Sequence, residues 1–178
     1  MKTGFIFIPL ALTILSSCGP KELDENNQKY IDANELKKQL EAVQKPSIVM
    51  ENDIIDSYIK QHQLQMQTTG SGLRYAIVKE NMKGKQLVSM DEITFKYKVS
   101  LLDGTLCYTS DKTGPKKIKI DMGNVESGLH QGLKLMKVGE KAIFILPPHL
   151  AHGLTGDNNL IPPKASVFYE IEVTAFNN

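Results

Sequence analysis

The sequence has no tryptophan among its 178 residues, and aromatic residues make up only 7% of it. An aromatic stacking platform for single-stranded nucleic acid is therefore not expected. The formal net charge is +1, so there is no charge excess to attract nucleic acid or an anionic membrane surface. We accordingly expect no nucleic-acid partner. No fixed-period repeat or long low-complexity tract indicates a repeat architecture.

Cysteine is also scarce, since Cys18 and Cys107 are the two in the chain. No intrachain disulfide is possible if Cys18 carries another modification. A buried, inert thiol is favoured at Cys107, because a reactive thiol needs an accessible setting and a lowered pKa. His149 and His152 lie near Asp157, but two histidines without a third placed ligand are weak evidence for a metal site. No nucleophile, metal cage or phosphate loop stands out, and we expect neither a metal nor a cofactor.

The N-terminus has the features of a targeting signal. Lys2 precedes an apolar run from Phe5 to Leu15, which is too short to span a bilayer. The run ends in Leu15-Ser16-Ser17-Cys18, which resembles the lipobox of bacterial lipoproteins. This resemblance implies a signal peptide over residues 1–17 and attachment of a diacylglycerol to Cys18. The alternative is an ordinary secretory signal with an incidental cysteine.

The residue after Cys18 is Gly19 rather than Asp, so nothing resembles the common inner-membrane retention signal. We therefore expect an envelope lipoprotein that is held in the outer membrane by its lipid and faces the periplasm, with an outward-facing position left open as the alternative. Residues 18–30 are polar and suit a tether.

Residues 31–66 form a predicted helical segment. Asp32 and Glu35 resemble a helix start, and Pro46 closes or interrupts that helix. A second helix is predicted over residues 52–63, where apolar side chains at helical spacing form a buried stripe: Ile54, Ile55, Tyr58 and Ile59. The segment either packs on the following domain or pairs with a second copy, and the oligomeric state stays open.

From about residue 70 onward the period becomes that of strands. Strands are predicted near residues 73–79, 92–102, 106–109, 116–120, 141–147 and 167–174. Asp103-Gly104 predicts a hairpin turn, and Leu129, Leu133 and Met136 predict a short helix with Ser127 as a possible cap. The expected fold class is α+β, with an antiparallel sheet wrapped around one helix over residues 70–178.

Several motifs in this order resemble FKBP-type peptidyl-prolyl isomerases over about residues 73–176. They are Leu102-Asp103-Gly104-Thr105, Met136-Lys137-Val138-Gly139-Glu140, Leu150-Ala151-His152-Gly153, Ile161-Pro162-Pro163 and Phe168-Tyr169-Glu170-Ile171. With the lipobox, the chain looks like a lipoprotein isomerase of Bacteroidetes-like bacteria, a group in which some relatives are associated with gliding motility. The resemblance implies an isomerase that assists the folding of exported proteins and binds proline-containing polypeptides.

The resemblance also implies the site residues. The catalytic positions are Tyr97, Cys107, Tyr108, His152 and Tyr169. The substrate-binding positions are Val125, Glu126, Leu129, Leu160 and Ile161, with the backbone amide of Glu126 donating to the peptide.

Several positions depart from the family pattern. Cys107 and Tyr108 replace adjacent Phe and Asp, Glu126 replaces the customary Ile or Val, His152 replaces a Tyr, and Lys116 stands where an aromatic residue is common. The Lys116-Lys117 pair by itself is typical of a solvated strand edge. These departures leave an alternative in which the domain is a weak or inactive peptide-binding module of an envelope complex.

Overall fold

A computed structural model describes residues 33–177, with the backbone alone at positions 41 and 43–48. The chain divides into residues 1–39 and residues 40–178, and the division falls inside the first helix. In the described part of the chain, no helix is both long enough and apolar enough to cross a membrane.

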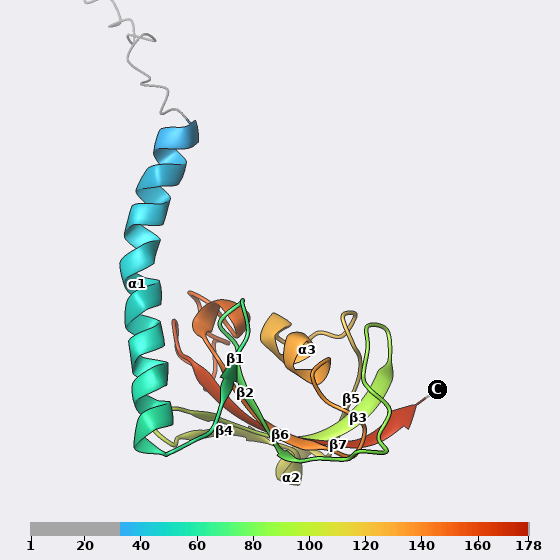
Figure 1. Cartoon of the computed structure of the whole chain (residues 1–178). Helices are drawn as coiled ribbons and strands as arrows, with labels where there is room; N and C mark the ends of the chain where they lie inside the picture. The colour runs from blue at the N-terminus through green and yellow to red at the C-terminus, as the bar shows by residue number, and fades with distance from the viewer. Residues whose placement is uncertain (1–32, 178) are drawn as a thin grey trace, which may run out of the picture. The chain divides into compact units, whose positions relative to one another are not determined.

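One antiparallel sheet organises the second unit (Figure 1). Its strands are β1 (Gln67–Thr68), β2 (Arg74–Lys79), β3 (Glu92–Leu101), β4 (Leu106–Thr109), β5 (Lys116–Lys119), β6 (Lys141–Leu146) and β7 (Val167–Asn177). Their order is β1-β2-β6-β7-β3-β4, and β5 pairs with the first half of β3 while β4 pairs with its second half. The predicted hairpin at Asp103-Gly104 is confirmed, because Gly104 has a φ of 89° and the Thr105 amide donates to Asp103 at 2.8 Å.

Three short helices accompany the sheet: α2 (Ser110–Thr113), α3 (Ser127–Leu133) and the 3₁₀ helix η2 (Pro148–Leu150). Figure 1 shows α3 on the concave side of the sheet. Strand β7 alternates between buried and more exposed residues along most of its length, which gives the sheet one apolar face. The predicted α+β architecture, with a sheet wrapped around one helix, is confirmed.

Helix α3 lies close to β6 because two of its residues have no side chain. A Cβ on Gly132 would lie 2.6 Å from the Phe144 ring, and one on Gly128 would lie 2.8 Å from Leu146. Leu129 and Leu133 fill the space beside these contacts and are 2% and 0% exposed. Burying such side chains contributes about 1.5–3 kcal/mol each. The predicted cap at Ser127 is wrong, since Ser127 is the first helical residue and Glu126 precedes it without a side-chain cap.

The two predicted N-terminal helices are one helix, α1 (Ala33–Gln61), and this corrects the break expected at Pro46. Proline removes a backbone N–H, but its fixed φ is compatible with a helix and does not force an end. The predicted stripe is only partly buried, because Ile55 is 0% exposed while Ile54 is 54% exposed. The expected helix start at Asp32 lies outside the described residues.

The second half of α1 contacts β2 through a buried cation. Arg74 is only 6% exposed, although charged side chains are rarely buried. Its guanidinium donates to Asp56 at 3.0 Å, to Asn52 at 3.0 Å and to the Gly72 carbonyl at 2.7 Å. Three acceptors offset much of the cost of removing this charge from water.

Candidate functional site

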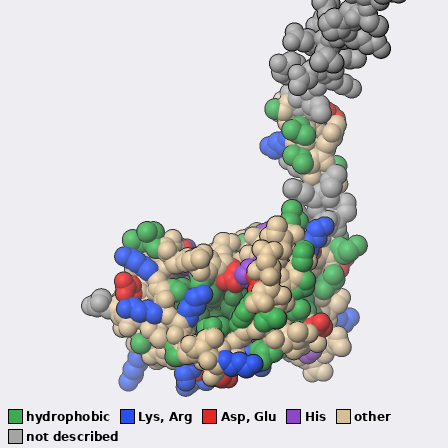
Figure 2. Space-filling view, turned by 180° about the vertical axis from the view of Figure 1, so that it is seen from behind, with side chains coloured by type: hydrophobic (Ala, Val, Ile, Leu, Met, Phe, Trp, Pro, Cys, Tyr) green, Lys and Arg blue, Asp and Glu red, His purple; other side chains and the backbone are tan. Residues whose placement is uncertain are grey.

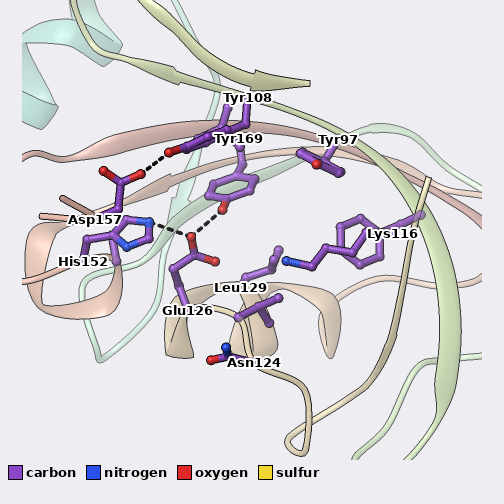
Figure 3. A pocket seen from close by; sticks show the side chains of 13 residues that line it. Tyr97, Tyr108, Lys116, Asn124, Glu126, Leu129, His152, Asp157 and Tyr169 are labelled. Atoms are coloured by element: carbon purple, nitrogen blue, oxygen red, sulfur yellow. Dashed lines mark hydrogen bonds and ion pairs between the residues drawn. The ribbon is translucent and has the colours of Figure 1, made fainter. Parts of the chain in front are cut away.

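A pocket of about 500 Å³ lies between the concave face of the sheet and α3. Figure 2 shows a hollow in which hydrophobic side chains gather, with acidic, histidine and basic side chains beside it. Figure 3 draws the side chains that line the pocket and labels most of them. The lining residues are Phe95, Tyr97, Val99, Tyr108, Lys116, Asn124, Val125, Glu126, Leu129, Ala151, His152, Asp157 and Tyr169.

The strand register places two tyrosines on one wall. Val99 of β3 pairs with Tyr169 of β7 on one side and with Tyr108 of β4 on the other. Directly paired residues project from the same face of a sheet. The three side chains therefore form a row across the pocket. Tyr97 lies two residues before Val99 on the same face, and its hydroxyl lies 3.0 Å from that of Thr113.

The opposite wall is formed by α3 and the segment before it. His130 of α3 fixes that segment, since its Nδ1 accepts the Asp121 amide and its Nε2 contacts the Gly123 carbonyl, each at 3.0 Å. These two bonds require the ring to be neutral with its proton on Nε2. Val125 and Glu126 follow directly. Within the described residues, the Glu126 amide N–H has no hydrogen-bond acceptor, so it is available to a bound peptide.

The carboxylate of Glu126 lies at the centre of a polar cluster inside the pocket (Figure 3). Its Oε1 accepts a hydrogen bond from the Tyr169 hydroxyl at 2.8 Å. The same oxygen lies 2.8 Å from Nε2 of His152, at ion-pair distance, although the ring N–H is not directed along a good hydrogen bond. Burial raises the pKa of the Tyr169 hydroxyl well above its usual value, and the nearby Glu126 charge raises it further. Tyr169 therefore stays a neutral donor at physiological pH.

A second polar cluster surrounds Asp157, in the segment that follows η2. Its Oδ2 accepts the hydroxyl of Tyr108, and its Oδ1 accepts the amides of Asn159 at 2.9 Å and Ile161 at 2.8 Å. Burial alone would raise the pKa of Asp157, but these hydrogen bonds lower it below its usual value. The same contact with Asp157 raises the pKa of Tyr108.

Seven of the ten predicted pocket residues line this pocket. They are Tyr97, Tyr108, Val125, Glu126, Leu129, His152 and Tyr169. The other three do not line it. Cys107 is 8% exposed, and its Sγ lies 3.7 Å from the Thr105 carbonyl and 3.8 Å from that of Leu160. Ile161 belongs to the core at 2% exposed, whereas Leu160 is 47% exposed.

Burial raises the pKa of the Cys107 thiol, and the nearby Asp157 charge raises it further. Such a thiol is a poor nucleophile at neutral pH. Cys18, the predicted lipid attachment residue, lies outside the described residues, as do the predicted signal peptide and tether.

Sequence reasoning missed Asp157 and Asn124 as pocket residues. It considered Asp157 only as a weak metal ligand, and no cluster of three His, Cys, Asp or Glu suited to a metal ion occurs in the described residues. The signal for Asp157 was present in Asp157-Asn158-Asn159, because Asp and Asn favour turns in which the side chain accepts a backbone amide. Asn158 has the positive φ, 59°, that such a turn often uses.

The arrangement suits a peptide whose apolar ring enters the pocket. Phe95, Val99 and Leu129 form the apolar lining of the pocket and are almost fully buried. The free amide of Glu126 offers a donor to a peptide carbonyl. No group in the pocket is placed as an activated nucleophile.

Comparison with known proteins agrees with this architecture. The family model "FKBP-type peptidyl-prolyl cis-trans isomerase" matches residues 83–174, just over half of the chain. A probable FKBP-type isomerase FkpA of Neisseria meningitidis is 32% identical over 108 residues, covering 61% of this chain and 39% of the relative. Mouse FKBP10, named a peptidyl-prolyl cis-trans isomerase, is 41% identical over 86 residues, covering 48% of this chain and 15% of the relative. The chain thus spans well under half the length of these relatives.

Solved structures match in fold. The crystal structure of FkpA from Escherichia coli has a TM-score of 0.61 at 26% identity, covering 83% of this chain and 74% of that one. The crystal structure of AtFKBP13 has a TM-score of 0.59 at 26% identity, covering 64% of this chain and 99% of that one.

Proposed function

This chain belongs to the family of FKBP-type peptidyl-prolyl cis-trans isomerases, and we propose that it catalyses X-Pro isomerisation in exported polypeptides. The observation that carries the proposal is the pocket, which joins an apolar floor at Leu129 to an unpaired backbone donor at Glu126. These are the two features that the reaction requires.

Isomerisation of an X-Pro bond crosses a barrier of about 20 kcal/mol because rotation removes the resonance of the amide. No proton transfer or covalent intermediate is needed. A pocket lowers the barrier when it binds the twisted amide better than the planar one. The proline ring would rest on Leu129 between Tyr97 and Tyr169, where water is excluded and the charge-separated planar amide is less well solvated. The Glu126 amide would donate to a carbonyl of the bound peptide.

Glu126 contributes a side chain as well as an amide. Its hydrogen bond from Tyr169 and its proximity to His152 fix the carboxylate against the wall of the pocket. The segment before α3, which carries the free Glu126 amide, is therefore held at two points. The Glu126 cluster holds its end, and His130 holds its start through the Asp121 amide. A fixed donor costs little reorganisation when the carbonyl rotates.

The direct test is cis–trans exchange of a short X-Pro peptide, measured by NMR with the full chain in detergent. We expect the exchange rate to rise with protein concentration. Val125→Arg, which places a charged chain in the pocket, should abolish the effect. Val88→Arg, at a position 50% exposed and outside the pocket, should preserve it. Catalysis is refuted if the natural chain gives no acceleration at high concentration.

A second candidate is a peptide-binding module with little catalysis. It is favoured by Cys107, which is buried against the Thr105 and Leu160 carbonyls instead of supplying an aromatic wall to the pocket. Restoring the family pattern with Cys107→Phe and Tyr108→Asp separates the two. A large gain in exchange rate shows that the natural pocket is degenerate and supports the module, whereas an unchanged rate from a natural chain that already accelerates exchange shows that Phe and Asp are dispensable here.

We also propose a location in the envelope, anchored through Cys18 and facing the periplasm. The support is the Leu15-Ser16-Ser17-Cys18 motif after an apolar run. Globomycin, which blocks lipoprotein signal peptidase, should cause the precursor to accumulate, and Cys18→Ala should not be lipidated. A soluble, unlipidated product from the natural sequence would exclude this anchor. The Bacteroidetes-like lipoprotein group remains the proposed relationship.

A further inference from the structure

Lys116 lines the pocket, and its side chain also stays exposed to solvent on the edge strand β5. In the β3–β5 ladder, Phe95 pairs with Lys116 and Ile93 pairs with Ile118. Ile118 is 7% exposed and belongs to the core, so its face of β5 is the inner one. Lys116 lies two residues before it on the same face. Figure 3 shows its amino group directed into the pocket beside Leu129.

Lys116 and its neighbour Lys117 differ in their ion pairs. Its neighbour Lys117, on the outer face, forms an ion pair with Glu92 at 3.2 Å. Among the described residues, Lys116 has no such partner, although two carboxylates line the same pocket. Glu126 is engaged by Tyr169 and His152, and Asp157 is engaged by Tyr108 and two amides.

The charged groups lie on different sides of the pocket. In Figure 3, Asp157, His152 and Glu126 follow one wall, and Lys116 extends from the other. Asn124, which also lines the pocket, adds an uncharged polar group. An acidic side chain of a bound peptide that lies beside Lys116 would therefore be closer to this cation than to the carboxylates of Glu126 and Asp157. The carboxylates opposite are already held by hydrogen-bond donors, which reduces their repulsion of a second acid.

We propose that Lys116 is a specificity residue that favours X-Pro substrates with a Glu or Asp side chain adjacent to the proline. The inference rests on the proposed function, because it needs a proline peptide in this pocket. It deepens that function by naming the substrate class. The aliphatic stem of Lys116 takes the place of an apolar wall, and its ammonium recognises a carboxylate on the peptide.

Peptide binding by the full chain in detergent tests this directly. The probes are Ala-Glu-Pro-Phe and Ala-Leu-Pro-Glu, each with its Gln and Lys counterpart, titrated by NMR while exchange rates are recorded. We expect at least one Glu peptide to bind about two- to fivefold more tightly than its Gln counterpart. That preference should shrink at 0.5 M salt, where charges are strongly screened.

Two variants make the test specific. Lys116→Met keeps a long apolar stem and should remove the Glu-over-Gln preference, whereas Lys117→Met makes the same change on the outer face and should keep it. Lys116→Glu should reverse the preference toward the Lys peptide. Equal affinity for Glu and Gln peptides in the natural chain, or a preference that survives in Lys116→Met, would overturn the proposal. The affinity ratio decides it even without catalysis, since an absent exchange enhancement bears on the proposed function alone.

Discussion

The Asp157 carboxylate should hold the Tyr108 wall to the segment after η2, and a double-mutant cycle tests this. The perturbations are Asp157→Ala, Tyr108→Phe and the two together. Asp157 accepts three hydrogen bonds, from the Tyr108 hydroxyl and from the amides of Asn159 and Ile161. Tyr108 also accepts from Asn159 Nδ2 at 3.1 Å, so its removal disturbs one further contact.

The size of the effect follows from these bonds. A hydrogen bond to a charged group contributes about 1.5–3 kcal/mol when buried, and half-burial here reduces that to about 1 kcal/mol each. Asp157→Ala should therefore lower the free energy of unfolding by about 3 kcal/mol and Tyr108→Phe by about 1 kcal/mol. At about 2–4 °C per kcal/mol for a chain of this size, the alanine variant should melt about 6–12 °C lower. The coupling energy between the two positions should be about 1 kcal/mol.

Urea unfolding of the four proteins measures the cycle. Asp103→Ala is a matched control, because Asp103 also accepts the amide two residues on but has no tyrosine partner. It should cost less than Asp157→Ala and should add independently to Tyr108→Phe. The reasoning is refuted if the losses from Asp157→Ala and Tyr108→Phe simply add, since Tyr108 would then not depend on Asp157.

The same carboxylate has a pH signature. Because folding lowers the pKa of Asp157, its contribution is present above its unfolded pKa of about 4 and is lost as pH falls through the folded value. Asp157→Ala should therefore make the acid limb of the stability curve shallower. The limb should not vanish, because hydrogen bonds from Lys134 to Asp121 and from the Thr105 amide to Asp103 also lower the pKa of those groups.

Two further predictions concern the packing of α3 and the inner cluster. Gly132→Ala brings a Cβ to 2.6 Å from the Phe144 ring and should cost about 1–3 kcal/mol in denaturant unfolding. Gly70→Ala, with nothing within 4 Å, should change stability by less than about 0.5 kcal/mol, and equal losses would contradict the close approach. Tyr169→Phe leaves Glu126 without its hydroxyl donor and should cost about 1–2 kcal/mol. It should also remove part of the stability loss above pH 10, because the natural Tyr169 resists ionisation in the fold, and an unchanged alkaline limb would contradict that.

Periodicity predicted the sheet well because the inner face of each long strand is apolar. The alternation in β7 and the Asp103-Gly104 turn are local signals that the fold obeys. The N-terminal helical segment was predicted less accurately, because Pro46 suggested a boundary between two helices. A proline in the sequence does not show whether the helix continues through it. The buried position of Arg74 was not predictable, because its partner Asp56 lies on another element and a charged residue is read as exposed.

The resemblance to the family predicted most pocket residues correctly, because their positions are set by the register of the strands or by helix α3. It placed Cys107 in the pocket as well, since the residue that usually stands there is larger and reaches further. The small thiol instead meets the Leu160 carbonyl. Asp157 escaped notice because its role depends on Tyr108, 49 residues away, and the family pattern gave no reason to pair them.

This pairing changes how the restoring variants must be designed. Tyr108→Asp alone would remove the donor to Asp157 and place a second carboxylate beside it. Two neighbouring carboxylates repel, so one would tend to hold a proton and the segment after η2 would lose a contact. A lower exchange rate in Cys107→Phe/Tyr108→Asp would then reflect this repulsion. Adding Asp157→Asn removes it while keeping an oxygen for the Asn159 and Ile161 amides. The triple variant should exchange X-Pro bonds faster than the double variant, and equal rates would show that the carboxylate at position 157 does not oppose one at position 108.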